Sequence, residues 1–234
     1  MKFISWSGGK DCSFALYKYT QTGVSDARCL LNMVRNTPLS GHQVSESLLQ
    51  AQAQRMGLDL VRERVSPNNS YLYHFDRIIN ILKEQGYNGG IFGDIYLEAH
   101  RNWIEKQCER LGIEPIFPLW GMPVEEIYTE FVRSGFVAKI IGVSKSYKQL
   151  LGEHLTMELY EKLLTLPDFD VCGENGEYHT FVSDSPLYTE AIPYRVSEAY
   201  ENEKLLGLRL DCSVQKCKIY SEHENVSHRN AKYI

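Results

Sequence analysis

Apolar residues along the first 143 positions alternate between two patterns, short unbroken runs and stripes with a spacing of three or four residues. The runs have the length of buried strands, and the stripes have the period of one helix face. The expected strands are Lys2–Trp6, Ala27–Val34, Leu58–Val65, Gly90–Ile95, Ile113–Pro118 and Phe136–Val143. The expected helices are Cys12–Tyr19, Val44–Met56, Leu97–Leu111, one carrying Phe75, Ile78, Ile79 and Leu82, and one carrying Val124, Ile127, Tyr128 and Phe131.

This alternation predicts a doubly wound α/β fold with a mostly parallel sheet over residues 1–144. Strands separated by helices pair in parallel through right-handed crossovers. The rhythm then changes to a short helix at Leu155–Leu164, turns over Pro167–Gly176 and one long alternating strand at Leu206–Val214. We therefore expect a smaller α+β region over residues 145–234. Ligands of doubly wound sheets bind beyond the carboxyl ends of the strands, which directs attention to the loops that follow them.

Composition and charge exclude several classes of protein. The chain has 234 residues, of which 43% are hydrophobic and 24% charged, so it is neither disordered nor fibrous. A net charge of −5 argues against bulk electrostatic binding of nucleic acid. No apolar run approaches the roughly 20 residues that span a bilayer, so no membrane partner is expected. Met1–Trp6 predicts a first strand and not a signal peptide, and six scattered cysteines predict reduced thiols in a cytoplasmic protein.

The strand Lys2–Trp6 runs directly into Ser7-Gly8-Gly9-Lys10-Asp11-Cys12-Ser13, which opens the next helix. We call this segment the phosphate loop. Its two glycines allow the backbone to turn tightly and approach a ligand. The first amides of the helix, its dipole and the charge of Lys10 all favour an anion there. The order of these parts predicts phosphate binding more specifically than a Gly-rich turn with an exposed lysine would.

A second candidate follows the strand Gly90–Ile95. Gly93-Asp94 lies at the edge where ligands bind, and the next helix carries Arg101 on a stripe that otherwise faces the core. A buried arginine needs a partner, since an unpaired buried charge is costly. Asp94, Glu105 or a bound anion could supply it. An internal ion pair that holds the helix to the strand explains this pattern as well as a binding site does.

A third candidate is the segment Gly173–Thr180, which we call the second motif. Glu174, Glu177 and His179 crowd around two glycines, which allow a tight loop. A carboxylate beside a histidine can tune that histidine for proton transfer near neutral pH. The competing interpretation is a solvated turn that leads into a strand at Tyr178–Val182.

Together these segments resemble the diphthine–ammonia ligase family. The phosphate loop is similar to the SGGKDS pyrophosphate loop (PP-loop) of the ATP-pyrophosphatase superfamily. Cys12 replaces the usual Ser, and because a thiol is a weaker donor we expect one contact to weaken. The second motif matches G-E-G-G-E-Y-E-T at six of eight places, with Asn175 for Gly and His179 for Glu, and Asp184 and Pro186 follow. The resemblance covers about residues 1–195 and includes the helix with Asp94, Arg101, Glu105 and Cys108.

The resemblance implies a fold of the HUP/PP-loop type and a two-step ligase. A substrate carboxylate attacks the α-phosphate of ATP and releases pyrophosphate, and ammonia then converts the acyl-adenylate to an amide and AMP. The implied ATP-binding residues are Ser7, Gly8, Gly9, Lys10, Asp11, Cys12, Ser13 and Met33, whose side chain equally suits a core position. The implied substrate-binding residues are Gly93, Asp94, Arg101, Glu105, Gly173, Glu174, Asn175, Gly176, Glu177 and Thr180. The implied catalytic residues are Lys10, Asp11, which would touch Mg²⁺, and Glu177 and His179, either of which would take a proton from ammonium.

The implied partners are ammonia and a carboxylate, either a small molecule or a group carried on a protein. Diphthine occurs on archaeal and eukaryotic elongation factor 2, so that factor is the implied partner in such a source. A bacterial source would need another acid. The source of ammonia and the oligomeric state, a homodimer included, stay open.

Two other functions compete with the ligase. A PP-loop enzyme that modifies tRNA would predict a catalytic cysteine pair and a basic surface, yet the chain has no CxxC and a negative charge. A non-catalytic sensor of adenine nucleotides would keep the phosphate loop but would not need the second motif. A zinc site is also conceivable, but its spacing fits no standard finger; its residues would be Cys212, Cys217, His223 and His228.

Overall fold

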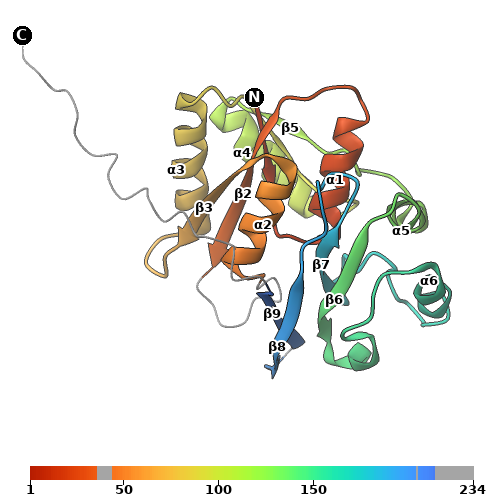
Figure 1. Cartoon of the computed structure of the whole chain (residues 1–234). Helices are drawn as coiled ribbons and strands as arrows, with labels where there is room; N and C mark the ends of the chain where they lie inside the picture. The colour runs from red at the N-terminus through yellow and green to blue at the C-terminus, as the bar shows by residue number, and fades with distance from the viewer. Residues whose placement is uncertain (36–43, 204, 214–234) are drawn as a thin grey trace, which may run out of the picture.

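Five parallel strands form the first sheet of the computed structural model, which describes residues 1–35, 44–203 and 205–213. The strand order is β3-β2-β1-β4-β5, and every neighbouring pair is parallel. Figure 1 labels β2, β3 and β5 of this sheet. The order of strands reverses between β1 and β4, so a ligand crevice is expected there. The strands are β1 (Lys2–Ser5), β2 (Ala27–Arg35), β3 (Asp59–Val65), β4 (Gly89–Ile91) and β5 (Glu114–Ile116). The predicted doubly wound arrangement is confirmed for these five strands.

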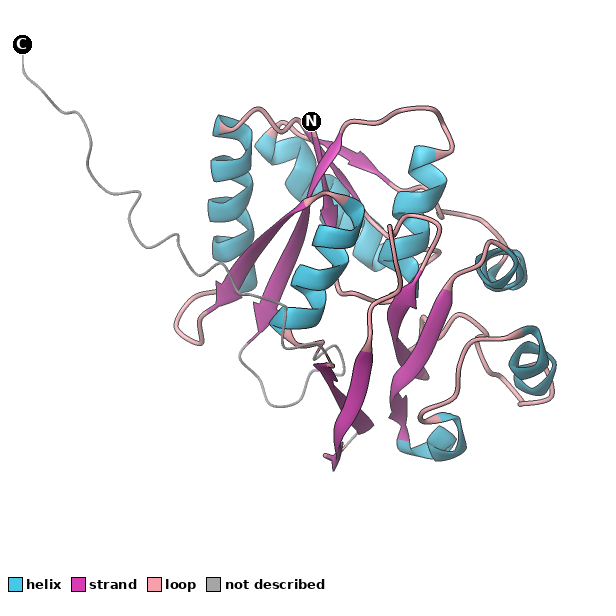
Figure 2. Ribbon diagram, viewed as in Figure 1, coloured by secondary structure: helices cyan, strands magenta, loops and turns pink. Residues whose placement is uncertain are grey.

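Helices cover both faces of this sheet (Figure 2). On one face, α1 (Lys10–Thr20) and α2 (Glu46–Met56) contribute to one apolar core. On the other face, α3 (Tyr71–Glu84) and α4 (Glu98–Leu111) contribute to a second core. Gly57 ends α2 at a φ of 66°, a left-handed conformation that glycine adopts without strain. The helical stripes predicted from the sequence therefore point into the two cores.

Four antiparallel strands form a second sheet in the order β7-β6-β9-β8. These strands are β6 (Val137–Ser144), β7 (Tyr178–Asp184), β8 (Tyr194–Glu201) and β9 (Leu205–Cys212). The same part of the chain contains α5 (Val124–Arg133), the 3₁₀ helix η1 (Lys145–Leu150) and α6 (Met157–Leu163). The helix and the long strand expected after residue 145 are thus present.

The strand predicted at Phe136–Val143 exists, but its predicted place in the parallel sheet is wrong. It is β6, which pairs antiparallel with β7 and β9. Most of β6 is buried, and a continuous apolar run gives no sign of which strand will be its neighbour. The chain changes sheet between β5 and β6. The domain boundary predicted after residue 144 stays a prediction.

The two sheets share one apolar core, which packs around α1. Phe14 of α1 makes edge-to-face contacts with Phe131 of α5 and with Phe136, at ring-centroid distances of 5.8 and 5.9 Å. At the carboxyl end of β1, the Val182 amide of β7 donates to the carbonyl of Gly8 at 3.0 Å. The antiparallel sheet therefore reaches the loop that begins α1. Among the described residues, no helix is both long and apolar enough to cross a bilayer.

Candidate functional site

A cleft of about 1490 Å³ opens at the carboxyl ends of the parallel strands. It is lined by the phosphate loop, the last residues of β2, the loop after β4, the beginnings of α2, α3 and α4, and much of the second motif. The switch point between β1 and β4 thus holds the cleft, as the fold predicts. Three segments that lie far apart in the sequence meet there.

The phosphate loop takes the strand-to-helix turn that its glycines predict. Gly8 has a φ of 85°, and a Cβ placed on it would lie 2.8 Å from Leu49 and 3.0 Å from Gln52. Gly9 is the N-cap residue of α1 and has no side chain of its own to cap the helix. The first amides of a helix lack intrahelical partners, so this end of α1 suits an anion.

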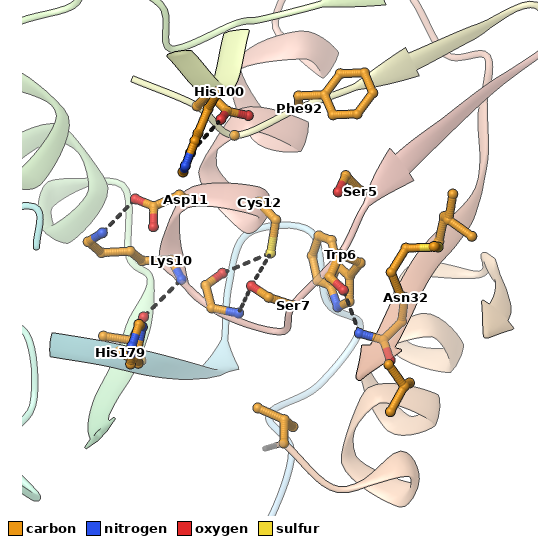
Figure 3. A pocket seen from close by; sticks show the side chains of 18 of the residues that line it. Ser5, Trp6, Ser7, Lys10, Asp11, Cys12, Asn32, Phe92, His100 and His179 are labelled. Carbon is orange, nitrogen blue, oxygen red and sulfur yellow. Dashed lines mark hydrogen bonds and ion pairs between the residues drawn. The ribbon is translucent and has the colours of Figure 1, made fainter. Parts of the chain in front are cut away.

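Lys10 supplies a buried positive charge beside this helix end. Its Nζ lies 2.6 Å from Asp11 Oδ1 (Figure 3). The same atom lies 5.4 Å from the centre of the Tyr178 ring. Burial lowers the pKa of Lys10, but the opposing effects of Asp11, Cys172 and Glu174 are larger together and raise the pKa to about 12. Lys10 is therefore charged at neutral pH and lines the cleft together with Asp11.

The remaining side chains of the phosphate loop bond mainly to the loop itself. Ser13 Oγ donates to the Gly9 carbonyl at 2.8 Å, and Cys12 Sγ donates to the same oxygen at 3.2 Å. Cys12 Sγ also lies 3.6 Å from Ser7 Oγ, which accepts the Gly9 amide at 3.4 Å. Burial is the main cause that raises the pKa of Cys12, so its thiol stays protonated. These bonds fix the loop, and of the three side chains those of Ser7 and Cys12 border the cleft.

The second motif touches the phosphate loop directly. The amide of Lys10 donates to Thr180 Oγ1 at 3.0 Å. A Cβ on Gly9 would lie 3.1 Å from the carbonyl oxygen of Thr180, so a larger residue there would press on β7. Thr180, predicted to bind substrate, thus caps an amide of α1 and also lines the cleft.

Glu177 and Glu174 occupy different environments, although they lie three residues apart. The carboxylate of Glu177 accepts the Asp170 amide at 3.3 Å and the Asn175 amide at 3.0 Å, with the Asn175 side chain at 3.4 Å. Glu177 is buried and does not line the cleft. Its side chain holds the second motif in shape, which the sequence did not reveal.

Glu174 lines the cleft, and among the described residues no hydrogen bond or ion pair holds its carboxylate. Burial raises its pKa to about 7, and Asp11, Asp94 and Asp170 add to the shift while Lys10 opposes it. A carboxyl with this pKa can hold or release a proton near neutral pH. Gly173, Gly176 and His179 line the same cleft, whereas Asn175 does not.

The loop after β4 closes the other side of the cleft. A Cβ on Gly93 would lie 2.8 Å from the backbone carbon of Asp11, so a larger residue would collide with α1. Asp94 lines the cleft, and its carboxylate lies 3.7 Å from His100 Nδ1. Burial raises the pKa of Asp94, and His100 lowers it. Gly93 and Asp94 thus lie where the sequence predicts a ligand.

Arg101 and Glu105 do not line the cleft. Arg101 Nε donates to Glu105 at 2.6 Å, and its guanidinium lies over Trp120 at 4.6 Å and over Phe117 at 5.3 Å. Of the three predicted partners for Arg101, the structure shows Glu105. Their substrate-binding role stays a prediction, and the pair fastens α4 to the turn after β5.

The carboxyl end of β2 forms the far wall of the cleft. Met33 lines it beside Asn32, whose side-chain amide donates to the Trp6 carbonyl at 2.7 Å. Met33 also packs against the second core, so both of the interpretations given for it apply to its environment. The ATP-binding role of Met33 stays a prediction.

Sequence reasoning missed Gln52, which is fully buried behind the phosphate loop. Its signal is a glutamine on the apolar stripe of α2, in line with Leu48 and Leu49. The zinc hypothesis can be followed only at Cys212, because its other three residues lie outside the described part of the chain. Across residues 1–35, 44–203 and 205–213, no group of three or more His, Cys, Asp or Glu is arranged to hold a metal, and all five cysteines are free.

Two family models match this chain. The model described as the diphthamide synthase N-terminal domain matches residues 1–115, and the diphthamide synthase C-terminal domain matches residues 123–208. The chain belongs to the diphthamide synthase family. The family prediction made from the two motifs is therefore confirmed, and so is the enzyme class, an ATP-dependent ligase of the diphthine–ammonia ligase type.

Curated relatives agree with this family. The diphthine–ammonia ligase of Rattus norvegicus is 29% identical over 224 residues, which covers 82% of each chain. The human diphthine–ammonia ligase is 28% identical over 218 residues, again with 82% of each chain covered. The enzyme of Schizosaccharomyces pombe is 35% identical over 115 residues, 47% of this chain and 19% of that one.

One solved structure also overlaps this fold. It is the U34-tRNA thiolase NcsA from Methanococcus maripaludis with its [4Fe-4S] cluster. It is 15% identical, covers 56% of each chain and has a TM-score of 0.36. A likeness at this level carries no argument about the function of this chain.

Proposed function

We propose that this chain uses ATP to adenylate a carboxylate and then transfers ammonia to the activated carbonyl, forming an amide. The observation that carries the proposal is that the phosphate loop and Glu174 of the second motif line one cleft. Its volume of about 1490 Å³ exceeds the roughly 300–1,000 Å³ typical of sites for one small molecule. A nucleotide and an acceptor can therefore lie side by side.

In the first step a carboxylate oxygen of the acceptor attacks the α-phosphorus of ATP. The bond from that phosphorus to the bridging oxygen breaks, and pyrophosphate leaves with its negative charge. The positive end of the α1 dipole and the buried ammonium of Lys10 stabilise this charge, while the Lys10 amide stays bonded to Thr180. Magnesium is usually held by one or two carboxylates together with substrate phosphates, so Asp11 would bind it jointly with ATP and the ion would neutralise phosphate charge.

In the second step the nitrogen of ammonia attacks the carbonyl carbon. The new C–N bond replaces the C–O bond to AMP, and the nitrogen must lose a proton. We assign this proton to Glu174, because its carboxylate faces the cleft and has a pKa of about 7. Glu177 is committed to three hydrogen bonds of its own loop. His179 also lines the cleft and is the second candidate.

The acceptor that the relatives' name supports is the carboxylate of diphthine. On this proposal the acceptor reaches the cleft as a residue of elongation factor 2, and ammonia arrives free or from a partner. A small carboxylic acid is the alternative acceptor, because the two departures from the family motif, Asn175 and His179, lie in the segment that would contact it.

The test measures each half of the reaction separately. The protein is incubated with ATP, Mg²⁺ and labelled pyrophosphate, with or without diphthine-bearing elongation factor 2. Acceptor-dependent exchange of label into ATP reports adenylation without ammonium. Adding ¹⁵N-ammonium should then yield AMP and place one ¹⁵N in the acceptor, as read by mass spectrometry. A panel of small carboxylic acids forms the second arm.

Glu174→Gln should preserve exchange and lower amide formation, and Lys10→Ala should lower both. If neither elongation factor 2 nor any small acid supports exchange of label, although ATP binds and stays intact, the chain is the competing nucleotide sensor. If Glu174→Gln leaves amide formation unchanged, His179 and not Glu174 is the proton acceptor.

A further inference from the structure

The side chain of Gln52 lies between the phosphate loop and β7. Its residue is fully buried in α2, where the neighbouring inward positions are apolar. Nε2 donates to the carbonyl of Gly8 at 3.1 Å and to the carbonyl of Val182 at 2.8 Å. Oε1 accepts the indole N–H of Trp6 at 2.8 Å. One amide therefore joins the end of β1, the phosphate loop and β7.

Chemistry fixes the orientation of this amide. A backbone carbonyl can only accept and an indole N–H can only donate, so the NH₂ must face the two carbonyls and the oxygen must face Trp6. Both hydrogens of Nε2 are then used, and no other side chain of this length satisfies all three partners. A buried polar group of this kind is costly unless it is fully bonded, so its presence on an apolar stripe needs an explanation.

Gly8 is the residue at which this contact matters. Its left-handed backbone turns the chain out of β1, and its carbonyl also accepts the Val182 amide at 3.0 Å. The direction of that carbonyl sets the plane of the next peptide, which carries the amide of Gly9 at the start of α1. A shift of the Gly8 carbonyl therefore rotates the Gly9 amide, which donates to Ser7 Oγ, and displaces the start of α1.

We propose that Gln52 is a positioning residue that fixes the phosphate loop in its anion-binding conformation and couples it to the strand of the second motif. It does not line the cleft and touches no substrate. The inference rests on the proposed function only in that the cleft holds ATP.

The experiment compares variants of the full chain by equilibrium dialysis with labelled ATP and Mg²⁺, beside their melting temperatures. Gln52→Met keeps length and burial but removes all three bonds. We expect ATP to bind about tenfold more weakly or worse, because the carbonyls and the indole lose their partner. Leu48→Ala, also fully buried in α2, is the control for lost stability, and the exposed Gln54→Met is the control for the substitution itself.

A second variant gives a readout that a purely structural role would not move. Gln52→Glu places oxygens against two carbonyls, so it should bind ATP poorly at pH 8. Protonation restores one donor, and its deficit relative to wild type should therefore shrink as the pH falls to 6. If Gln52→Met does not fold, Gln52→Glu, measured at pH 6 and pH 8, carries the test alone.

The outcomes separate this inference from the proposed function. Wild-type protein that fails to bind ATP overturns the function itself. Wild-type binding with an unchanged affinity in Gln52→Met, or a loss no larger than that in a Leu48→Ala variant of equal melting temperature, overturns the positioning role alone. A deficit confined to the Gln52 variants, and dependent on pH in Gln52→Glu, supports it.

Discussion

The phosphate loop and the second motif both turn on glycines, but they present their chemistry in opposite ways. The phosphate loop offers the positive end of a helix and one buried ammonium, and its Cys12 and Ser13 side chains bond back to the Gly9 carbonyl. The second motif uses one glutamate to hold its backbone and leaves another facing the cleft. A phosphate can be bound by a folded main chain, whereas proton transfer needs a side chain that the fold does not consume.

The largest expected effect on ATP binding comes from removing the ammonium of the phosphate loop. Lys10→Ala should weaken ATP binding roughly 30- to 150-fold, because a hydrogen-bonded charge contributes about 2–3 kcal/mol. Dialysis with labelled ATP measures this. Lys18→Ala on the same helix removes a lysine paired with Glu130 and should bind ATP like the wild type. If Lys10→Ala binds ATP within threefold of the wild-type affinity, the phosphate loop is not the ATP-binding site.

The structural half of the second motif is tested by Glu177→Gln. The amide puts an N–H₂ group where the loop supplies donors, so we expect a loss of about 1–3 kcal/mol in stability. Acceptor-dependent AMP formation should fall with it, while ATP affinity stays within about threefold, since the phosphate loop keeps its own bonds. Thermal melts and dialysis measure the two effects, with the exposed Glu161→Gln as the control. If ATP binding disappears instead, the division of labour between the two loops is wrong.

The cleft-facing glutamate of the second motif is tested by the pH dependence of stability in Glu174→Gln. The folded pKa of Glu174, about 7, lies above its ordinary value of 4.5. The carboxyl is therefore harder to ionise in the folded protein, and it destabilises the fold increasingly as pH rises from 4.5 through 7. Glu174→Gln should match the wild type near pH 4.5 and be more stable at pH 8, by on the order of 1–2 kcal/mol after allowing for partial exposure. Melting temperatures across this range measure the difference; a constant difference would contradict the shifted pKa.

The smallest effect is expected for Cys12→Ser, which restores the more usual residue of the motif. The thiol and a hydroxyl can both donate to the Gly9 carbonyl, and neither carries a charge here, since burial raises the pKa of Cys12. ATP affinity should change by less than about threefold, in the direction of tighter binding. A larger change would mean that residue 12 contacts the nucleotide more closely than its bond to Gly9 indicates.

The sequence predicts the parallel sheet well because its strands and helices differ in period. It also predicts the phosphate loop, since strand, glycines, lysine and helix occur in one uninterrupted order. It does not place β6, because pairing partners are set by packing over the whole chain. Nor does it separate Glu174 from Glu177, because residues three apart in a turn can face either way. That choice depends on where Asp170 and Asn175 direct their amides.

Gln52 shows the other limit of reading a sequence. A polar residue on an apolar helical stripe signals a buried contact, but its partners, Trp6 and Val182, lie 46 and 130 residues away. Only the assembled fold shows that one amide serves both sheets.

The bond between the Lys10 amide and Thr180 has a consequence for dissecting the protein. A fragment that stops before β6 would lose the hydroxyl at this helix end and the amide that reaches the Gly8 carbonyl. We therefore expect a fragment of the amino-terminal half to hold its phosphate loop less firmly than the full chain does. Grafting a foreign carboxy-terminal half onto it, by recombination or by engineering, would succeed only if the incoming strand carried equivalent groups in the same register.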